Sequence, residues 1–189
     1  VPVILPAVAA TGSWQTTSSS TTAMLTDVSV LSPTDAWAVG SSGAIVRWNG
    51  STWSTIQAPT SQWLWGVDAS ASTNVWVVGD NGTVLRWNGS TWTSIDAPTS
   101  EHLLGVSVIS ASDIWVVGEA GSLFRWNGSA WADYSPSDAS VEIFYDIDFT
   151  SSTNGWVVGS NGQIRQWDGV SWSLVSSGTS NALLSIAAI

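Results

Sequence analysis

Residues 74–92 read NVWVVGDNGTVLRWNGSTW, and this stretch decides the fold. It holds two short apolar runs, residues 75–79 and 83–87, on either side of the turn residues Asp80-Asn81-Gly82. The next turn opens with Asn88-Gly89, a pair that favours a tight type I′ hairpin because both of its residues then take positive φ. Short runs of β-branched and aromatic residues between turn signals predict β-strands joined as hairpins.

The stretch is one copy of a repeat marked by tryptophan. In each copy four short strands are expected, in the second copy over residues 64–69, 75–79, 83–87 and 90–95, and no stretch keeps a helical period. Four short strands per repeat of about 40 residues are typical of a β-propeller blade. The tryptophans recur at spacings of 39, 39 and 41 residues in three series: Trp37, Trp76, Trp115 and Trp156; Trp48, Trp87, Trp126 and Trp167; and Trp53, Trp92, Trp131 and Trp172, which Trp14 extends toward the N-terminus.

The chain begins and ends within a repeat, so its ends are expected to complete a ring. We expect a single all-β propeller domain with complete blades over residues 23–61, 62–100, 101–141 and 142–180. Residues 1–22 then supply the last part of a fifth blade, and residues 181–189 its first strand. Because the chain has no initiator Met, Val1 is expected to follow a removed signal peptide or a cut from a longer chain.

The apolar terminal residues are the candidates for this closure. Within one chain they form a fifth blade that leaves no free sheet edge. The alternative is that the N-terminal segment completes a neighbour's blade, and repeated head to tail such strand addition gives a filament. The residues concerned are Val1, Val3, Ile4, Leu5, Val8, Leu183, Leu184 and Ile186.

The repeated motifs resemble tryptophan-rich bacterial propeller repeats of the BNR/Asp-box and Ycf48-like families. The motifs are Asn74–Gly79 and Arg86–Trp92 with their counterparts, and the resemblance covers nearly the whole chain. It implies the propeller fold but no single function, because such families include glycan-handling enzymes, photosystem assembly factors and adhesive proteins. The chain departs from the Asp-box consensus, since its hairpin reads Asn-Gly-Ser-Thr-Trp without the Asp.

One arginine in each repeat lies beside a repeat tryptophan, which indicates a structural role rather than the arginine cluster of a sialidase. Arg47, Arg86 and Arg125 are expected to pair with a neighbouring blade. Arg165 is shifted by one position, and in a strand this turns its side chain to the opposite face, so the same pairing is not expected there.

The composition excludes several classes of partner. Charged residues make up 10% of the chain, the net charge is −10 and the pI is about 4.1. Such a surface repels nucleic acid and anionic membranes, and no apolar run reaches the length of a membrane span. The chain has no Lys and no Cys. Low charge with many Ser and Thr points to an extracellular or cell-surface protein.

Catalysis finds little support in the sequence. With one His and no Cys, neither a zinc site nor a Ser-His-Asp triad is predicted. Asp146 and Asp148 share a strand face and could form a glycosidase pair, but a packing role near a central channel is favoured. Calcium could bind at Asp80-Asn81-Gly82, but this sequence varies between repeats, so ordinary turns and no cofactor are expected.

Two tryptophans, Trp63 and Trp65, belong to no series. Both begin a first strand, at the expected rim of the central channel. Trp65 alternates with Val67 and is expected in the core, whereas Trp63 is a candidate for stacking on a sugar or a protein partner. Its expected neighbours are Glu101, His102, Glu142 and Tyr145.

Together these features favour a non-enzymatic extracellular scaffold or interaction module that assembles with itself or binds a glycan or cell-surface partner. The alternatives are a lectin with aromatic sites on its rim and a glycosidase that uses Asp146 and Asp148. Glycosylation is open at four turn sequons if the chain is secreted by a host with the machinery; they are Asn49, Asn81, Asn88 and Asn127.

Overall fold

The computed structural model describes residues 16–137 and 142–188. They form four antiparallel sheets of four strands, and within each sheet the strand order follows the chain. The first two sheets contain β1 (Leu25–Ser32), β2 (Asp35–Gly40), β3 (Ile45–Trp48) and β4 (Trp53–Thr55), then β5 (Leu64–Ala71), β6 (Asn74–Gly79), β7 (Thr83–Trp87) and β8 (Trp92–Ser94). The other two contain β9 (Leu103–Ser110), β10 (Asp113–Gly118), β11 (Leu123–Trp126) and β12 (Trp131–Asp133), then β13 (Phe144–Ser151), β14 (Asn154–Gly159), β15 (Ile164–Trp167) and β16 (Trp172–Val175).

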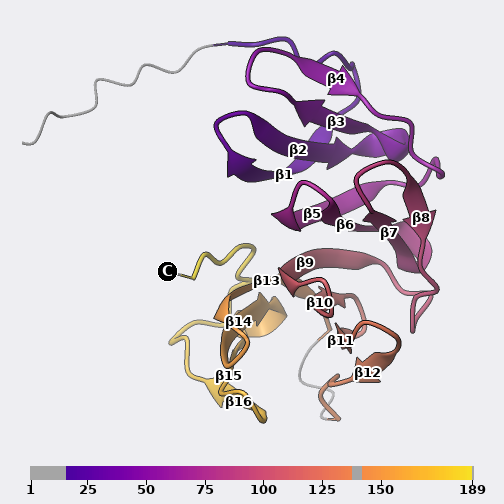
Figure 1. Cartoon of the computed structure of the whole chain (residues 1–189). Helices are drawn as coiled ribbons and strands as arrows, with labels where there is room; N and C mark the ends of the chain where they lie inside the picture. The colour runs from indigo at the N-terminus through magenta and orange to yellow at the C-terminus, as the bar shows by residue number, and fades with distance from the viewer. Residues whose placement is uncertain (1–15, 138–141, 189) are drawn as a thin grey trace, which may run out of the picture.

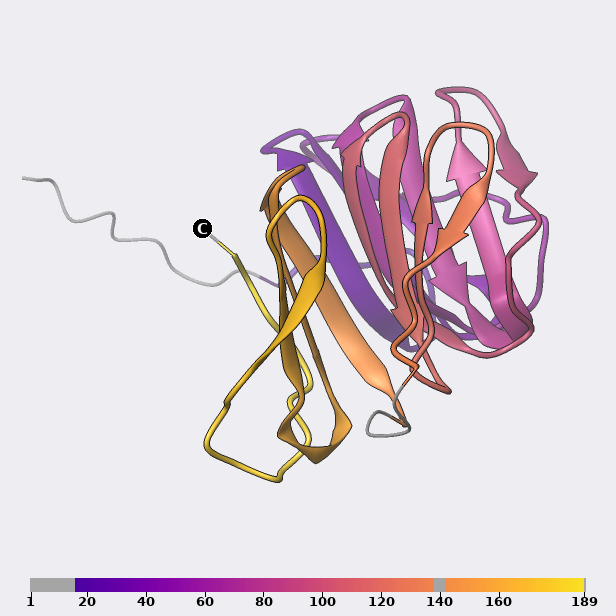
Figure 2. The ribbon, with the colours of Figure 1, turned by 90° about the horizontal axis from the view of Figure 1, so that it is seen from below.

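The four predicted four-stranded units are therefore confirmed. The sheets follow one another along an arc, with β1, β5, β9 and β13 on its inner side and the fourth strands on its outer side (Figure 1). Turned by 90°, the sheets are seen packed side by side (Figure 2). Within the described ranges no helix is long and apolar enough to cross a membrane; the helical segments are single 3₁₀ turns.

The Asn-Gly hairpins differ from the predicted type I′ turns. Trp87 pairs with Trp92, so four residues form the loop between them, and only Gly89, with φ 99°, has positive φ in it. Asn88 Oδ1 accepts hydrogen bonds from the amides of Ser90 at 2.9 Å and Thr91 at 3.0 Å. The prediction is wrong because the Asn side chain caps a longer loop, which leaves its own backbone in an ordinary conformation.

Indole rings fill the space between sheets, as their strict spacing predicts. The second-strand rings Trp37, Trp76 and Trp115 have no exposed surface. Each packs against a tryptophan pair from the third and fourth strands of the next sheet, with ring centroids 5.1 to 6.4 Å apart: Trp87 and Trp92, Trp126 and Trp131, and Trp167 and Trp172. Rings of this size dominate the packing energy.

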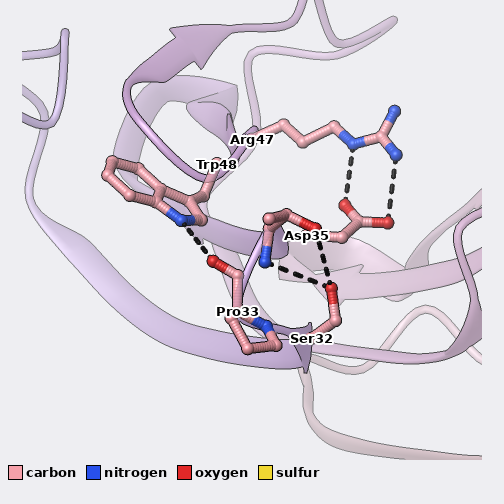
Figure 3. Close-up of polar contacts among 6 residues, drawn as sticks. Ser32, Pro33, Asp35, Arg47 and Trp48 are labelled. Carbon is pink, nitrogen blue, oxygen red and sulfur yellow. Dashed lines mark hydrogen bonds and ion pairs between the residues drawn. The ribbon is translucent and has the colours of Figure 1, made fainter.

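The repeat arginines find their partners within their own sheet. Arg47 donates two hydrogen bonds to Asp35, at 2.9 and 3.1 Å (Figure 3). Its guanidinium carbon lies 4.8 Å from the Trp37 ring centroid. The prediction of a partner in the neighbouring blade is wrong, because Arg47 stands directly opposite Trp37 in the β2–β3 register. Arg125 repeats both contacts with Asp113 and Trp115.

The shifted arginine of the fourth sheet behaves as predicted. Arg165 stands opposite Val157, and Gln166 takes the place opposite Trp156. Gln166 Nε2 donates a hydrogen bond to Asn154 at 3.4 Å, in place of the Arg–Asp pair. The one-residue shift therefore turns Arg165 to the other face of β15, where it is buried.

Candidate functional site

The face of the first sheet that points away from the second sheet is the largest departure from the repeat. Val28 and Val30 on β1 are 56% and 68% exposed. Their counterparts Val67 and Val108 are 4% and 7% exposed, because a preceding sheet covers them. Among residues 16–137 and 142–188 no sheet covers β1 in this way. The first sheet thus presents an apolar face of the kind that is buried at the interior junctions.

This face contains a cavity of about 300 Å³ that we call the tryptophan slot, defined by Val30, Ala36, Trp48 and Trp53. The matching residues of the second sheet enclose the Trp37 ring; they are Ala69, Val75, Trp87 and Trp92. The Trp48 and Trp53 ring centroids lie 5.7 Å apart, against 5.5 Å for Trp87 and Trp92. The slot therefore already has the geometry of one that holds an indole.

Local contacts keep the slot in shape. Trp48 Nε1 donates a 3.0 Å hydrogen bond to the carbonyl oxygen of Pro33, which fixes the ring at one wall of the cavity (Figure 3). Thr17 lines the cavity from the described N-terminal segment. The slot is preorganised, so its side chains would lose little conformational entropy when a ligand binds.

The fourth sheet ends the stack with an uncovered second-strand tryptophan. Trp156 is partly exposed, whereas Trp37, Trp76 and Trp115 are fully buried. In the described part of the chain no aromatic ring contacts it, although each of the other three packs against a tryptophan pair. In the described residues the two ends of the stack thus differ from the interior junctions: the fourth sheet has a ring that enters no slot, and the first sheet has a slot that receives no ring.

The C-terminal segment lies where a next first strand would begin. The amides of Ile186 and Ala188 donate hydrogen bonds to Asp146 Oδ2 at 2.9 Å and Asp148 Oδ2 at 2.8 Å. The same bonds join interior sheets: Val67 donates to Asp27 at 2.8 Å, and Val108 to Asp68 at 2.6 Å. Residues 181–188 nevertheless form no β-strand, since they pair with no second strand in the described ranges. The predicted closure residues Val1, Val3, Ile4, Leu5 and Val8 lie outside the described residues.

Carboxylates of the first strands accept hydrogen bonds from main-chain amides of the next first strand or of the C-terminal segment. Asp146 and Asp148 each use Oδ1 for the amide of the following residue and Oδ2 for the C-terminal segment. Burial raises the pKa of Asp68 and of Asp146, and the amide hydrogen bonds oppose this rise. These contacts give the pair Asp146 and Asp148 a role in packing.

A second cluster lies at the rim between the second and third sheets. The Trp63 and Trp65 rings stack with centroids 5.0 Å apart and planes at 10°. Trp65 Nε1 donates a 2.7 Å hydrogen bond to Asp80 Oδ1, and Nδ1 of His102 lies 2.8 Å from the same oxygen. The prediction that Trp65 belongs to the core is wrong: it is partly exposed, because its polar edge binds Asp80 at the rim.

The structure brings together only some of the predicted ligand residues. Trp63 and His102 meet through Trp65 and Asp80. Glu101 adjoins this cluster through its main-chain carbonyl, which accepts a 2.9 Å hydrogen bond from the amide of Gly82. The carbonyl of Glu142 accepts the equivalent bond from Gly121, at 3.2 Å, one junction further along. Glu142 and Tyr145 lie at the next junction, at the start of the fourth sheet.

The sequence suggests Asp80 only as a turn or calcium residue, yet its carboxylate connects Trp65 and His102 in the rim cluster. The available signal was its position, because the other repeats have Ser41, Glu119 and Ser160 there. Within the described ranges no three His, Asp or Glu side chains are grouped so that they could hold a metal ion. The four sequon residues lie exposed in turns.

No family model matches the chain, and no curated protein matches it. Among solved structures, YCF48 from Cyanidioschyzon merolae aligns with a TM-score of 0.65 and 20% identity, over 88% of this chain and 64% of that one. "YCF48 bound to D1 peptide" aligns with a TM-score of 0.54 and 17% identity, over 83% and 68%. The RRP9 WD40 repeats align at 0.64 and 12%, over 85% and 54%.

These likenesses concern the fold. The chain is an all-β protein whose four four-stranded sheets are arranged as in the YCF48 and WD40 propellers. The resemblance drawn from the tryptophan motifs is confirmed at this level. The chain spans 54% to 68% of the length of these structures.

Proposed function

We propose that the protein is a non-enzymatic extracellular scaffold or interaction module that assembles through the open ends of its blade stack. The observation that carries this proposal is the apolar face of the first sheet with its tryptophan slot, which no other sheet of residues 16–137 and 142–188 covers. Exposed apolar patches of this kind mark interaction surfaces in soluble proteins. The low content of charged residues, 10%, and the absence of Lys fit an extracellular setting.

In this proposal the two termini form a fifth, split blade. The hydrogen bonds of Ile186 and Ala188 to β13 support a first strand at this position. At the other end, Thr17 lines the slot of Trp48 and Trp53. Ile56, which follows Thr17 by 39 residues, lines the corresponding surface at Trp87 and Trp92. The chain thus enters the first sheet along the path that links interior sheets. Residues 1–15 would supply outer strands of this blade, either in the same chain or in a neighbouring chain. The second arrangement gives an oligomer or a filament.

Removing residues 1–8 tests the proposal. We expect the truncated chain either to lose oligomers or to unfold at a clearly lower temperature, because an apolar strand no longer covers the open end. Light scattering coupled to gel filtration measures the first effect, and thermal denaturation followed by circular dichroism the second. A chain in which residues 1–8 are replaced by Gly and Ser controls for length. A truncated protein with the size and stability of its parent would contradict the proposal.

A lectin is the second candidate function, and the rim cluster favours it. Stacked indoles beside a carboxylate and an imidazole offer both an apolar platform and hydrogen-bonding groups for a sugar.

On a glycan array we expect binding that Trp63→Ala reduces at least about tenfold. The variant Val170→Ala, in an exposed loop of the fourth sheet, should bind like the parent. Failure of the parent protein to bind any glycan, or equal binding by Trp63→Ala, would rule out this candidate.

A further inference from the structure

The group that the tryptophan slot lacks can be identified from the interior junctions. At each of these three junctions the slot of one sheet receives a ring from the second strand of the preceding sheet. Two parts of such a preceding sheet have described counterparts: residues 183–188 lie at the first-strand position beside β13, and Thr17 lies on the linker path into the first sheet. The missing element is therefore a second strand that carries a tryptophan.

Residues 1–15 do not supply this ring in the register of the repeat. Their single tryptophan, Trp14, precedes Trp53 by 39 residues and so belongs to the fourth-strand series. A ring that precedes Trp37 by the same spacing would fall before Val1. The slot thus lacks an in-register partner within residues 1–189, although its walls are preorganised.

The C-terminal segment offers an edge to such a strand. Its amides at Ile186 and Ala188 are used by Asp146 and Asp148. Because successive residues of an extended segment face opposite edges, the amides of Ser185 and Ala187 face the side on which β6 pairs with β5. In the described part of the chain neither amide has a hydrogen-bond partner. An added strand could pair with this edge and place its ring in the slot.

We infer that the open end binds an extended β-strand with a tryptophan at its centre, of the type Asp/Asn-Xaa-Trp-Val-Val-Gly, with the indole in the tryptophan slot. The sequence of β10, DIWVVG at residues 113–118, is such a strand. This inference names the chemistry of the partner for the interaction role proposed above and rests on it. The binding mode is strand addition, in which main-chain pairing gives affinity and the side-chain pocket gives specificity.

The test uses the full chain and a dye-labelled peptide of residues 112–119, SDIWVVGE, with binding followed by fluorescence anisotropy. We expect saturable binding, and a Trp115→Ala version of the peptide should bind at least about thirtyfold more weakly, as for a central aromatic anchor. The native peptide should also raise the unfolding temperature of the protein, because it binds only the folded state.

Two matched protein variants locate the site. Val30→Asp places a carboxylate in the slot, at a side chain that is 68% exposed and so not needed for folding. It should weaken peptide binding at least about tenfold. Val170→Asp introduces the same charge at a side chain that is 82% exposed in a distant loop, and should bind the peptide unchanged. Circular dichroism confirms that both variants are folded.

The outcomes separate this inference from the proposed function. Absence of binding to the full chain, equal binding of the Trp115→Ala peptide, or equal binding by Val30→Asp would overturn the inference. Binding only to a chain without residues 1–8 would also overturn it, because the chain's own N-terminus would then occupy the slot. The proposed assembly fails on a separate result, an unchanged size and stability after removal of residues 1–8.

Discussion

Replacing Trp115 by Ala is expected to lower the free energy of unfolding by about 3–5 kcal/mol, the range for large-to-small changes of buried aromatic residues. Trp115 has no exposed surface. Its ring lies 5.1 Å from Trp167 and 5.4 Å from Trp172, and stacks on Phe149 at 5.3 Å. Truncation would open a cavity between the third and fourth sheets that these rigid rings cannot close.

The same change would also uncover an arginine. The guanidinium carbon of Arg125 lies 5.2 Å from the Trp115 ring centroid, and the guanidinium also pairs with Asp113. Loss of the ring removes a cation–π contact, which contributes on the order of 0.5–2 kcal/mol. The Arg–Asp pair would remain, so the loss is dominated by the cavity.

Urea unfolding followed by circular dichroism measures the effect, and Trp156→Ala is the matched control. Trp156 occupies the same place in the fourth repeat, but it is partly exposed and contacts no aromatic ring of the described residues. From the contacts of the described residues, its replacement should cost less than about 1.5 kcal/mol. Equal losses for the two variants would contradict this expectation and would show that a further blade covers Trp156 in solution.

Gly118→Ala is expected to cost about 3 kcal/mol, the upper part of the range for overpacked sites. A Cβ atom at this position would lie 2.1 Å from the carbonyl oxygen of His102 and 2.9 Å from Leu103 Cα. The carbonyl cannot retreat easily, because it accepts a 2.9 Å hydrogen bond from the amide of Glu119. The strain would therefore separate β9 from β10, which pair through Gly118 and Leu103.

Gly178→Ala is the control for this variant. No atom lies within 4 Å of the added Cβ, although the φ of 73° disfavours an alanine by about 1–2 kcal/mol. Thermal and urea unfolding of both variants should therefore show the larger loss for Gly118→Ala. A smaller loss for Gly118→Ala than for Gly178→Ala would contradict the close approach of the two strands.

Several elements could be predicted because they depend on local sequence. The apolar runs bounded by Gly, Asn and Asp located β6 and β7 to within one residue. The one-residue shift of Arg165 predicted its reversed face, since side chains alternate along a strand. The conformation of the Asn-Gly turns could not be predicted from the dipeptide alone, because the Asn88 side chain accepts hydrogen bonds from the backbone amides of the loop.

The candidate sites depended on contacts between distant residues and were predicted less well. Asp80 joins Trp65 to His102 across two sheets, although the three residues are far apart in the sequence. The partner of Arg47 was placed in the wrong sheet, because only the pairing of β2 with β3 brings Asp35 and Trp37 to it.

The sequence alone determined the four four-stranded sheets of residues 16–137 and 142–188 and which residues lie in each, because the spacing of the tryptophans is a property of the chain itself. It could not determine which of those tryptophans are covered. Trp115 and Trp156 occupy the same position in the repeat, yet one is buried and the other partly exposed. Only the tertiary structure decided this, because the burial of a ring depends on the sheet that packs against it, and a stack of sheets has two ends.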